Sequence, residues 1–247
     1  ELVFKLYDTY GFPVDLTNDI GRESGLEIDI EGYERLMHEQ VSRGRSAGNF
    51  AVDYSEKINL PGATEFIGYN QSKTDSKIVA LYREGNETNE AVEGDKVAVV
   101  LDKTVFYAES GGQVGDSGVV VNNSATININ DCKKSGSHFL HFGYVQSGSF
   151  RVGDNVQANI LNDRRQLITC NHSATHLLHE ALRAVLGDHV EQRGSLVDDE
   201  RFRFDFSHDS AVTEDQIRQV ENIVNKEILK NTEVVTNSMS MEEAKRK

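Results

Sequence analysis

The sequence is poor in cysteine and has no long apolar segment. Its two cysteines, Cys132 and Cys170, lie far apart, so they provide no disulfide framework, and this usage is normal for a reducing compartment. No apolar run approaches the roughly 20 residues of a membrane helix, and no apolar signal region is present. Internal repeats and low-complexity segments are also lacking. These absences argue against a secreted disulfide scaffold, a membrane-spanning protein and a repeat protein, and we expect a cytoplasmic location.

Positive charge is also scarce. The 247 residues include 26 Lys and Arg against 40 Asp and Glu, which leaves a formal net charge of −14. This charge repels phosphate at long range and argues against DNA binding and indiscriminate RNA binding. Any RNA contact must be local, and the short basic groups are either such contacts or a solvated surface: Arg164 with Arg165, Arg193, Arg201 with Arg203, and residues 245–247.

The residue pattern changes along the chain. The first fifty residues have a helical pattern, in which Pro13 suits a first helical turn and Asp29 is a plausible cap. The residues at helical spacing after that cap are Ile30, Tyr33, Met37, Gln40 and Val41. Residues 42–49 break this pattern. From about Lys77 to Leu161, short β-rich runs separated by Gly, Asn, Asp and Ser predict a small barrel or sandwich.

A long helix and two strands are predicted after residue 163. Gly187 ends the helix, and strand-like runs follow over 189–197 and 201–206. Thr213 with Gln216 then forms a capping box ahead of a second amphipathic helix. The apolar stripe of the long helix comprises Leu167, Cys170, Ala174, Leu177, Leu178, Ala181 and Val185.

The last residues predict a strand over 233–238 and another capping box, Ser240 with Glu243, four residues before the chain ends. The chain also begins at Glu1 rather than Met. We therefore expect a part of a longer protein.

Three histidines in the long helix form the sharpest cluster of chemical groups. Spacing of four puts His172 and His176 on one face, where two imidazoles can reach one metal ion. His179 is seven residues beyond His172, about 10 Å of helix rise, so one ion does not easily take all three. The histidines lie roughly opposite the apolar stripe, so a solvated face is the alternative. Zinc needs three or four protein ligands, and no other Cys or His has a matching spacing, so the pair predicts half a metal site.

A glycine-rich run over 106–118 is the second feature. Four glycines surround Glu109, Gln113 and Asp116, and glycine permits positive φ and close backbone approach to a ligand. A plain hairpin turn is the alternative. The run is neither a phosphate-binding loop nor a dinucleotide fingerprint, since it lacks the lysine of the first and the strand and helix context of the second.

Small polar side chains accompany the histidines. Thr175 lies between His172 and His176, and Gln192, Arg193 and Ser195 lie on the strand that follows the helix. Hydroxyl and amide groups near a metal pair can sort substrates by hydrogen bonding, although such residues are equally common on an idle surface.

Together these segments resemble the alanyl-tRNA synthetases over essentially the whole chain. LYDTYGFPVDLT is similar to the end of that family's helical tRNA-recognition region, FYAESGGQVGD to its glycine-rich editing motif, and NHSATHLLHEALR with GSLV and RFDFSH to its editing core. The resemblance implies an α+β fold in three parts. These are a helical segment over 1–52, a β-barrel subdomain over 56–162, and a truncated α/β editing core over 163–247, similar to that of threonyl-tRNA synthetase.

The resemblance also implies a reaction, the hydrolysis of the ester that links serine or glycine to alanine tRNA. A synthetic pocket sized for alanine cannot exclude glycine and rejects an added hydroxyl poorly, so a second, hydrolytic site restores accuracy. His172 and His176 would be two zinc ligands, with the others in a downstream Cys-x-x-x-His motif that this sequence lacks. We therefore expect impaired zinc binding and impaired hydrolysis in this chain.

The remaining site residues take their roles from the same resemblance. Thr175, Gln192 and Ser195 would be the residues of the hydrolytic site that sort substrates, and Arg193 would contact the substrate. Gly111, Gly112, Gln113 and Asp116 would border the pocket from the barrel side. The alanine-activating site, which binds ATP and alanine, would lie before residue 1.

Two alternatives remain. The first is a tRNA-positioning module without chemistry, which the incomplete ligand set favours. The second is a free-standing alanyl-tRNA editing protein, in which the helical opening would be out of place.

Overall fold

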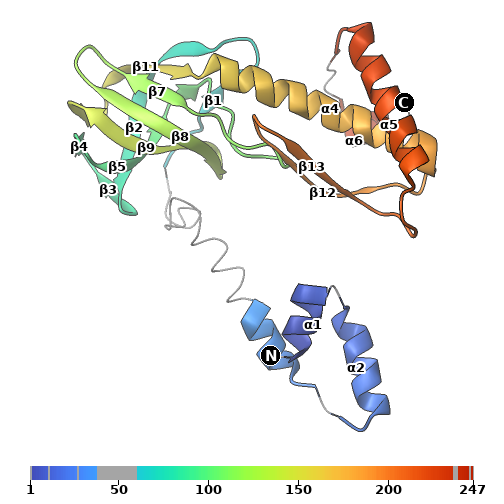
Figure 1. Ribbon diagram of the computed structural model, residues 1–247. Helices are drawn as coiled ribbons and strands as arrows, with labels where there is room; N and C mark the ends of the chain where they lie inside the picture. The colour runs from blue at the N-terminus through green and yellow to red at the C-terminus, as the bar shows by residue number, and fades with distance from the viewer. Residues whose placement is uncertain are drawn as a thin grey trace. The chain divides into compact units, whose positions relative to one another are not determined.

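The computed structural model describes residues 2–10, 12–26, 28–37, 60–235, 239–244 and 246. The chain divides into two compact units, Glu1–Ile58 and Asn59–Lys247 (Figure 1). The predicted boundary between 52 and 56 falls outside the described residues. Among the residues described, no helix combines the length and apolar character needed to cross a membrane.

The first unit contains α1 (Leu2–Tyr10), α2 (Val14–Glu23) and a further helix over 30–37. Asp29 caps the last of these as predicted, because its Oδ1 accepts the Gly32 N–H at 2.8 Å. Pro13 directly precedes α2 as its N-cap residue and so lies just outside the first turn. Gln40, Val41 and the predicted break over 42–49 lie outside the described residues.

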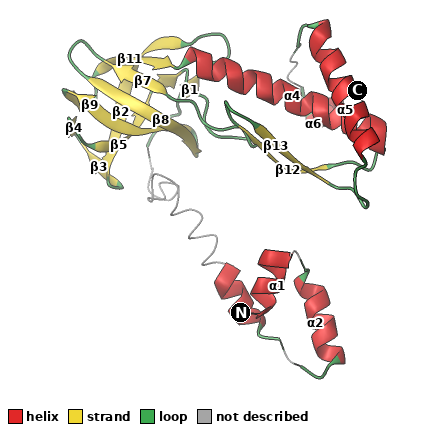
Figure 2. Cartoon of the chain, in the orientation of Figure 1, coloured by secondary structure: helices red, strands yellow, loops and turns green. Residues whose placement is uncertain are grey.

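The second unit begins with a β-barrel, drawn as yellow strands in Figure 2. Strands β11, β7, β8, β9, β5 and β2 pair in that order, and β11 also pairs with β2, which closes the ring. β3 extends the sheet beyond β2, and two short pairs, β1 with β6 and β4 with β10, flank it. This arrangement confirms the α+β class with a barrel subdomain and resolves the choice between barrel and sandwich.

Eleven strands, β1 to β11, lie between residues 65 and 160 of the described chain. They are β1 Glu65–Phe66, β2 Lys73–Arg83, β3 Asn86–Thr88, β4 Glu90–Val92, β5 Lys96–Leu101, β6 Lys103–Thr104, β7 Gly118–Val121, β8 Thr126–Ser135, β9 His138–Ser147, β10 Ser149–Arg151 and β11 Asn155–Ile160. The β-rich region therefore begins before Lys77, where the sequence predicted its start. The first half of β2 buries Thr74 and Ser76, which do not give an apolar alternation that a sequence pattern can reveal.

After the barrel, α4 (Asn162–Leu186) leads to a hairpin of β12 (Gln192–Val197) and β13 (Phe202–Phe206). α5 (Glu214–Lys230) packs on α4, and a short α6 (Met241–Ala244) follows. Figure 2 shows the hairpin and α5 beside α4. The core between these elements contains Ala181, Leu182, Val190 and Val220.

The predicted helix signals of this region are present. Gly187 follows the last residue of α4, and Thr213 with Gln216 forms a complete capping box at α5. Ser240 and Glu243 exchange the hydrogen bonds of a second capping box. Residues 233–235 are not in a strand, so that part of the strand prediction was wrong, and residues 236–238 lie outside the description.

A fully buried histidine lies in the barrel wall. His141 Nδ1 bonds the Val99 carbonyl at 2.9 Å, so this nitrogen carries the proton. Nε2 therefore accepts from Thr104 Oγ1 at 2.8 Å, and the same Thr104 oxygen accepts the Phe106 N–H at 3.0 Å. Burial lowers the pKa of His141 from 6.5 to about 4, because a charged ring has no access to water there.

We predict that this histidine makes the barrel sensitive to acid. The folded state holds His141 neutral down to about pH 4, whereas the unfolded state takes up a proton near pH 6.5. Stability is therefore full above the unfolded pKa and is lost as pH falls from about 6.5 towards 4. The loss approaches about 3 kcal/mol, at about 1.4 kcal/mol per pKa unit.

Urea unfolding of the chain and of a His141→Gln variant, each from pH 7 to pH 4, measures this contribution. The stability difference between the two proteins should shrink by about 3 kcal/mol over that range. A difference that stays constant with pH contradicts a neutral buried His141.

Candidate functional site

A buried ion pair joins the start of α4 to the barrel. The Arg165 guanidinium bonds both carboxylate oxygens of Asp116 and donates to the Gly68 and Val105 carbonyls at 2.8 and 3.0 Å. Asp116 is only 2% exposed and also accepts the Tyr107 N–H at 2.7 Å. Its carboxylate is thus engaged in the joint, and no hydrogen bond in the described part of the chain links it to another predicted site residue.

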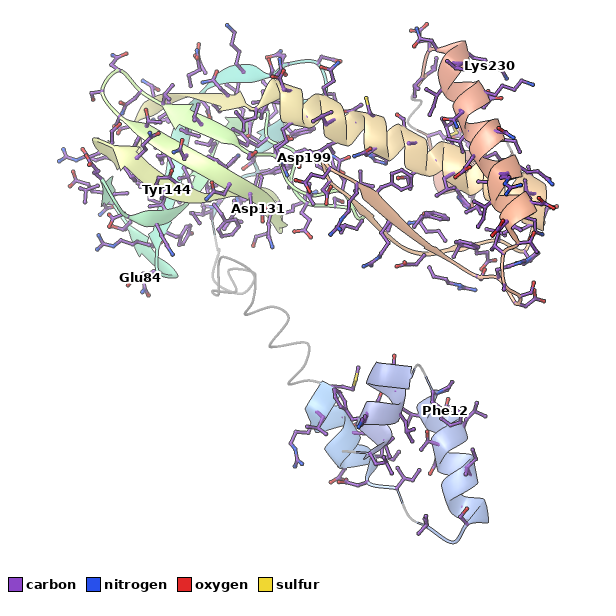
Figure 3. The ribbon with its side chains drawn as sticks, in the orientation of Figure 1. Phe12, Glu84, Asp131, Tyr144, Asp199 and Lys230 are labelled. Carbon is purple, nitrogen blue, oxygen red and sulfur yellow. The ribbon has the colours of Figure 1, made fainter. Side chains whose placement is uncertain are left out.

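Arg164 strengthens the same joint. It donates to the Gly115 carbonyl at 2.9 Å and pairs with Asp199 at 2.9 Å, a residue labelled in Figure 3 where the hairpin approaches the barrel. Both arginines are less than a quarter exposed, so the solvated-surface interpretation is wrong for them. Their partners are distant in sequence, so charge alone gave no signal of these contacts.

The glycine-rich run makes a tight turn whose backbone docks on β12. Ser110 and Gln113 exchange backbone hydrogen bonds across the turn. The Val197 N–H donates to the Gly112 carbonyl at 2.8 Å, and the Val114 N–H donates to the Val197 carbonyl at 3.0 Å. The run therefore forms a turn, as the alternative of a plain hairpin turn predicted. It also places Gln113 beside the β12–β13 hairpin.

The two histidines of the candidate metal pair lie together on α4. The rings of His172 and His176 stack with centroids 5.1 Å apart and planes 17° apart. His172 Nδ1 lies 2.7 Å from Gln113 Oε1, and an amide oxygen only accepts, so Nδ1 carries the proton and Nε2 keeps its lone pair. Burial, followed by the neighbouring His176, lowers the pKa of His172 and favours the neutral ring.

The predicted apolar stripe of α4 is buried only in its second half, where Leu178, Ala181 and Val185 pack in the core. Leu167 and Cys170 of the predicted apolar stripe are exposed, whereas Ile168 and Thr175 are buried.

His179 packs against Phe204 of β13 with ring centroids 5.1 Å apart, and its Nε2 is buried without a partner in the described residues. The solvated-face interpretation therefore holds for exposed His176 and fails for half-buried His172 and His179. The barrel loop and hairpin cover the histidine side, and α5 covers the apolar stripe only in its second half.

The predicted substrate-sorting residues fall into two groups. Gln192 Nε2 donates to Ser195 Oγ at 3.1 Å, and that hydroxyl donates to the Gly111 carbonyl at 3.4 Å, which links the hairpin to the glycine turn. Thr175, one helical turn from His172, is 6% exposed and donates to the Asn171 carbonyl at 2.8 Å. Arg193 is exposed and pairs with Glu191 at 3.1 Å.

Asn171 is a contributor that the sequence did not indicate. Its side-chain amide donates to the Asp198 carbonyl at 2.8 Å, which fixes the hairpin turn against the helix next to His172. Asparagine before the histidines has no distinctive spacing, and its partner lies 27 residues away. Only the folded arrangement reveals this role.

We predict that Gly112→Ala loosens the joint between the glycine turn and β12. Gly112 has a φ of +84°, and an added Cβ would lie 2.3 Å from Ser195 Oγ and 2.5 Å from its carbonyl oxygen. Backbone strain at such a position costs about 1–3 kcal/mol, and the contact with β12 backbone adds to it. The melting transition of the second unit, followed by calorimetry, should fall to a lower temperature.

Gly111→Ala is the matched control. Its φ is +59°, but a Cβ there meets nothing within 4 Å, so only the strain of a left-handed residue remains, about 1 kcal/mol. Equal losses of melting temperature in the two variants would show that the close contact with Ser195 does not matter.

Comparison with known proteins gives a consistent result. The family model described as class II (A) tRNA synthetases matches residues 1–164. The alanine–tRNA ligases of Pseudomonas entomophila (strain L48) and Pseudomonas syringae pv. syringae (strain B728a) are each 51% identical over 247 residues. That of Saccharophagus degradans (strain 2-40) is 49% identical. Each match covers 100% of this chain and 28% of the relative. The chain therefore belongs to the class II (A) tRNA synthetases, and over its whole length it is similar to a part of the alanine–tRNA ligases.

Proposed function

We propose that this chain is part of a longer alanine–tRNA ligase and contributes to its editing site. That site would hydrolyse alanine tRNA that carries serine or glycine in place of alanine. The proposal rests on three segments, distant in the sequence, that contact one another in the fold. The histidine pair of α4, the Gln113 turn of the barrel and the Gln192–Ser195 side of β12 are joined by hydrogen bonds. Three polar elements from distant parts of the chain are thus held together, and we infer that they line a pocket for a small polar amino acid.

The histidine pair fits a zinc ion as two of its ligands. Zinc takes neutral imidazoles, and His172 presents an Nε2 lone pair because Gln113 holds its Nδ1 proton. The ring nitrogens of His176 have no hydrogen-bond partner among the described residues. Within that same part of the chain, no Cys, Asp, Glu or third His completes a cluster with this pair. We infer a shared site, with the remaining ligands supplied by the Cys-x-x-x-His motif that the family resemblance implies. Zinc would supply Lewis-acid chemistry at the ester or its attacking water.

The residues of this chain would select the substrate. Gln192 and Ser195 offer an amide and a hydroxyl that can bond a serine hydroxyl, whereas alanine offers no such group. Thr175 lies on the buried side of α4, where its bulk and oxygen limit what the pocket accepts. Arg193 is exposed beside this group and suits a contact with the tRNA or its ester.

The activities of the longer protein belong to the same proposal. Alanine tRNA would be the partner, and ATP and alanine would bind at an activating site outside this sequence. The reaction there would be the ligation of alanine to its tRNA, in the cytoplasm. Similarity along the entire chain to ligases, together with the class II match over 1–164, favours this over a free-standing editing protein.

Hydrolysis of serylated alanine tRNA tests the editing proposal. The full-length ligase that contains this sequence should release serine, and a His172→Ala, His176→Ala variant should lose about 100-fold or more in rate, since it lacks two zinc ligands. Ser173→Ala is the matched control, because Ser173 lies on the same helix and is exposed. It should hydrolyse normally.

The 247-residue chain assayed alone separates editing from tRNA positioning. We expect weak zinc binding and slow hydrolysis from it, with full values restored in the longer protein. If the longer protein binds zinc yet does not hydrolyse seryl-tRNA, the editing proposal fails and a tRNA-positioning role takes its place.

We predict that Gln113 fixes the orientation of His172 for metal binding. In the full-length ligase, Gln113→Leu removes the acceptor of the Nδ1 proton, so the ring can turn or change tautomer. Loss of such a supporting hydrogen bond typically lowers metal affinity about 10–100-fold. Competition with a chelator measures the zinc affinity independently of hydrolysis.

Gln113→Glu is the matched control for that variant. It keeps an oxygen acceptor at nearly the same place, so zinc affinity should fall much less than in Gln113→Leu. Equal zinc affinity in Gln113→Leu and the parent would show that the hydrogen bond does not position His172.

A further inference from the structure

A second histidine pair lies at the open end of the β12–β13 hairpin. His189 precedes β12, in the connection from α4, and His208 follows β13, in the connection to α5. The pairing of Gln192 with Phe206 brings these two connections side by side. Val197, which contacts the glycine turn, lies at the other end of the same hairpin, where it pairs with Phe202. The second pair thus lies at the opposite end of the hairpin from the glycine turn that contacts His172, and Figure 1 shows the course of β12 and β13 between these ends.

The two imidazoles are held close by the backbone around them. His189 Nε2 lies 2.9 Å from His208 Nδ1, and the rings stack with centroids 5.2 Å apart. Ser207 fixes the strands beneath them, because its hydroxyl donates to the His189 carbonyl at 3.1 Å and accepts the Glu191 N–H at 3.0 Å. The ring positions therefore follow from strand pairing and do not depend on flexible side chains alone.

A carboxylate completes a set of three ligand atoms. Asp209 Oδ1 lies 4.0 Å from His208 Nδ1, and the two ring nitrogens and this oxygen all lie within 4.8 Å of one another. This is the only group of three His, Cys, Asp or Glu residues with such geometry in the described part of the chain. Asp209 is 93% exposed, so its side chain can move towards the nitrogens without disturbing packing.

We propose that His189, His208 and Asp209 form a second metal site, which binds a divalent ion of the zinc class. Two nitrogens about 2.0–2.1 Å from one ion lie roughly 3 Å apart when the angle at the metal is near 90°, close to the separation found here. Two imidazoles and one carboxylate suit zinc, cobalt or nickel, with water in the remaining positions. The ion stabilises the connections that enter and leave the hairpin.

The protons of the pair are compatible with this role. Ser210 Oγ lies 3.2 Å from His208 Nε2, and this contact suits an Nε2–H donor, which leaves the Nδ1 lone pair available. Without metal, the His189 Nε2–H donates to that lone pair. Metal binding moves the His189 proton from Nε2 to Nδ1 through solvent, so two neutral rings release no net proton. The ion then takes the place of the shared proton.

Titration with cobalt and zinc tests this site in a background that lacks the other one. In the His172→Gln, His176→Gln variant of this chain, we expect one ion per chain with micromolar affinity. Adding His189→Gln should abolish that binding, and adding Asp209→Asn should weaken it about tenfold. Zinc should also raise the melting temperature of the background variant, since a ligand of the folded state stabilises it.

Asp188→Asn is the matched control, because Asp188 is another exposed acid next to His189 and pairs with Arg183 at 3.3 Å. It should bind metal as the background does. Asp209→Asn changes only an exposed side chain, so it tests the site even if a histidine variant fails to fold. The proposal is overturned if the background binds no ion at micromolar concentration, or if Asp209→Asn and Asp188→Asn bind it equally.

The nitrogen signals of the two rings give a second, structural readout. Zinc should shift the side-chain nitrogen resonances of His189 and His208 and change the tautomer of His189. Metal binding that leaves those resonances unchanged would place the ion elsewhere and overturn the assignment.

Discussion

The arrangement of the second unit depends on the buried contact between Arg165 and Asp116. A guanidinium and a carboxylate removed from water are stabilised when other groups satisfy their hydrogen-bonding capacity, and here the Gly68 and Val105 carbonyls each accept one further guanidinium N–H. The contact fixes the first turns of α4 on the barrel. With a rise of 1.5 Å per residue, the helix then brings His172 about 10 Å further along, level with the glycine turn.

Features that depend on near neighbours in the sequence were predictable. The capping boxes at Thr213 and Ser240 and the helix end at Gly187 follow from residues within one turn of each other. The apolar strands of the barrel were also predictable, because they are short β-rich runs separated by Gly, Asn, Asp and Ser. The polar start of β2 was not, since Thr74 and Ser76 face inwards only because β11 closes the ring beside them.

The covered face of α4 shows a different limit. Periodicity identifies a stripe of apolar residues but not which elements will cover it. α4 runs from the barrel past the hairpin to α5, so its covered face changes along its length. Leu167 is exposed and Ile168 buried for that reason. The spacing of His172 from His176 and the glycine-rich run around Gln113 singled out these two residues separately, and no spacing rule could pair them across 59 residues.

The contact between the glycine turn and β12 is made by main-chain atoms of Gly112, Val114 and Val197. Main-chain hydrogen bonds do not depend on which side chain a residue carries. The joint between the turn and β12 therefore does not require particular side chains at Val114 and Val197. Gly112 is the exception, because the backbone of Ser195 occupies the space of any side chain. Such a joint holds the glycine turn against β12 through the main chain, whichever side chain stands at position 114.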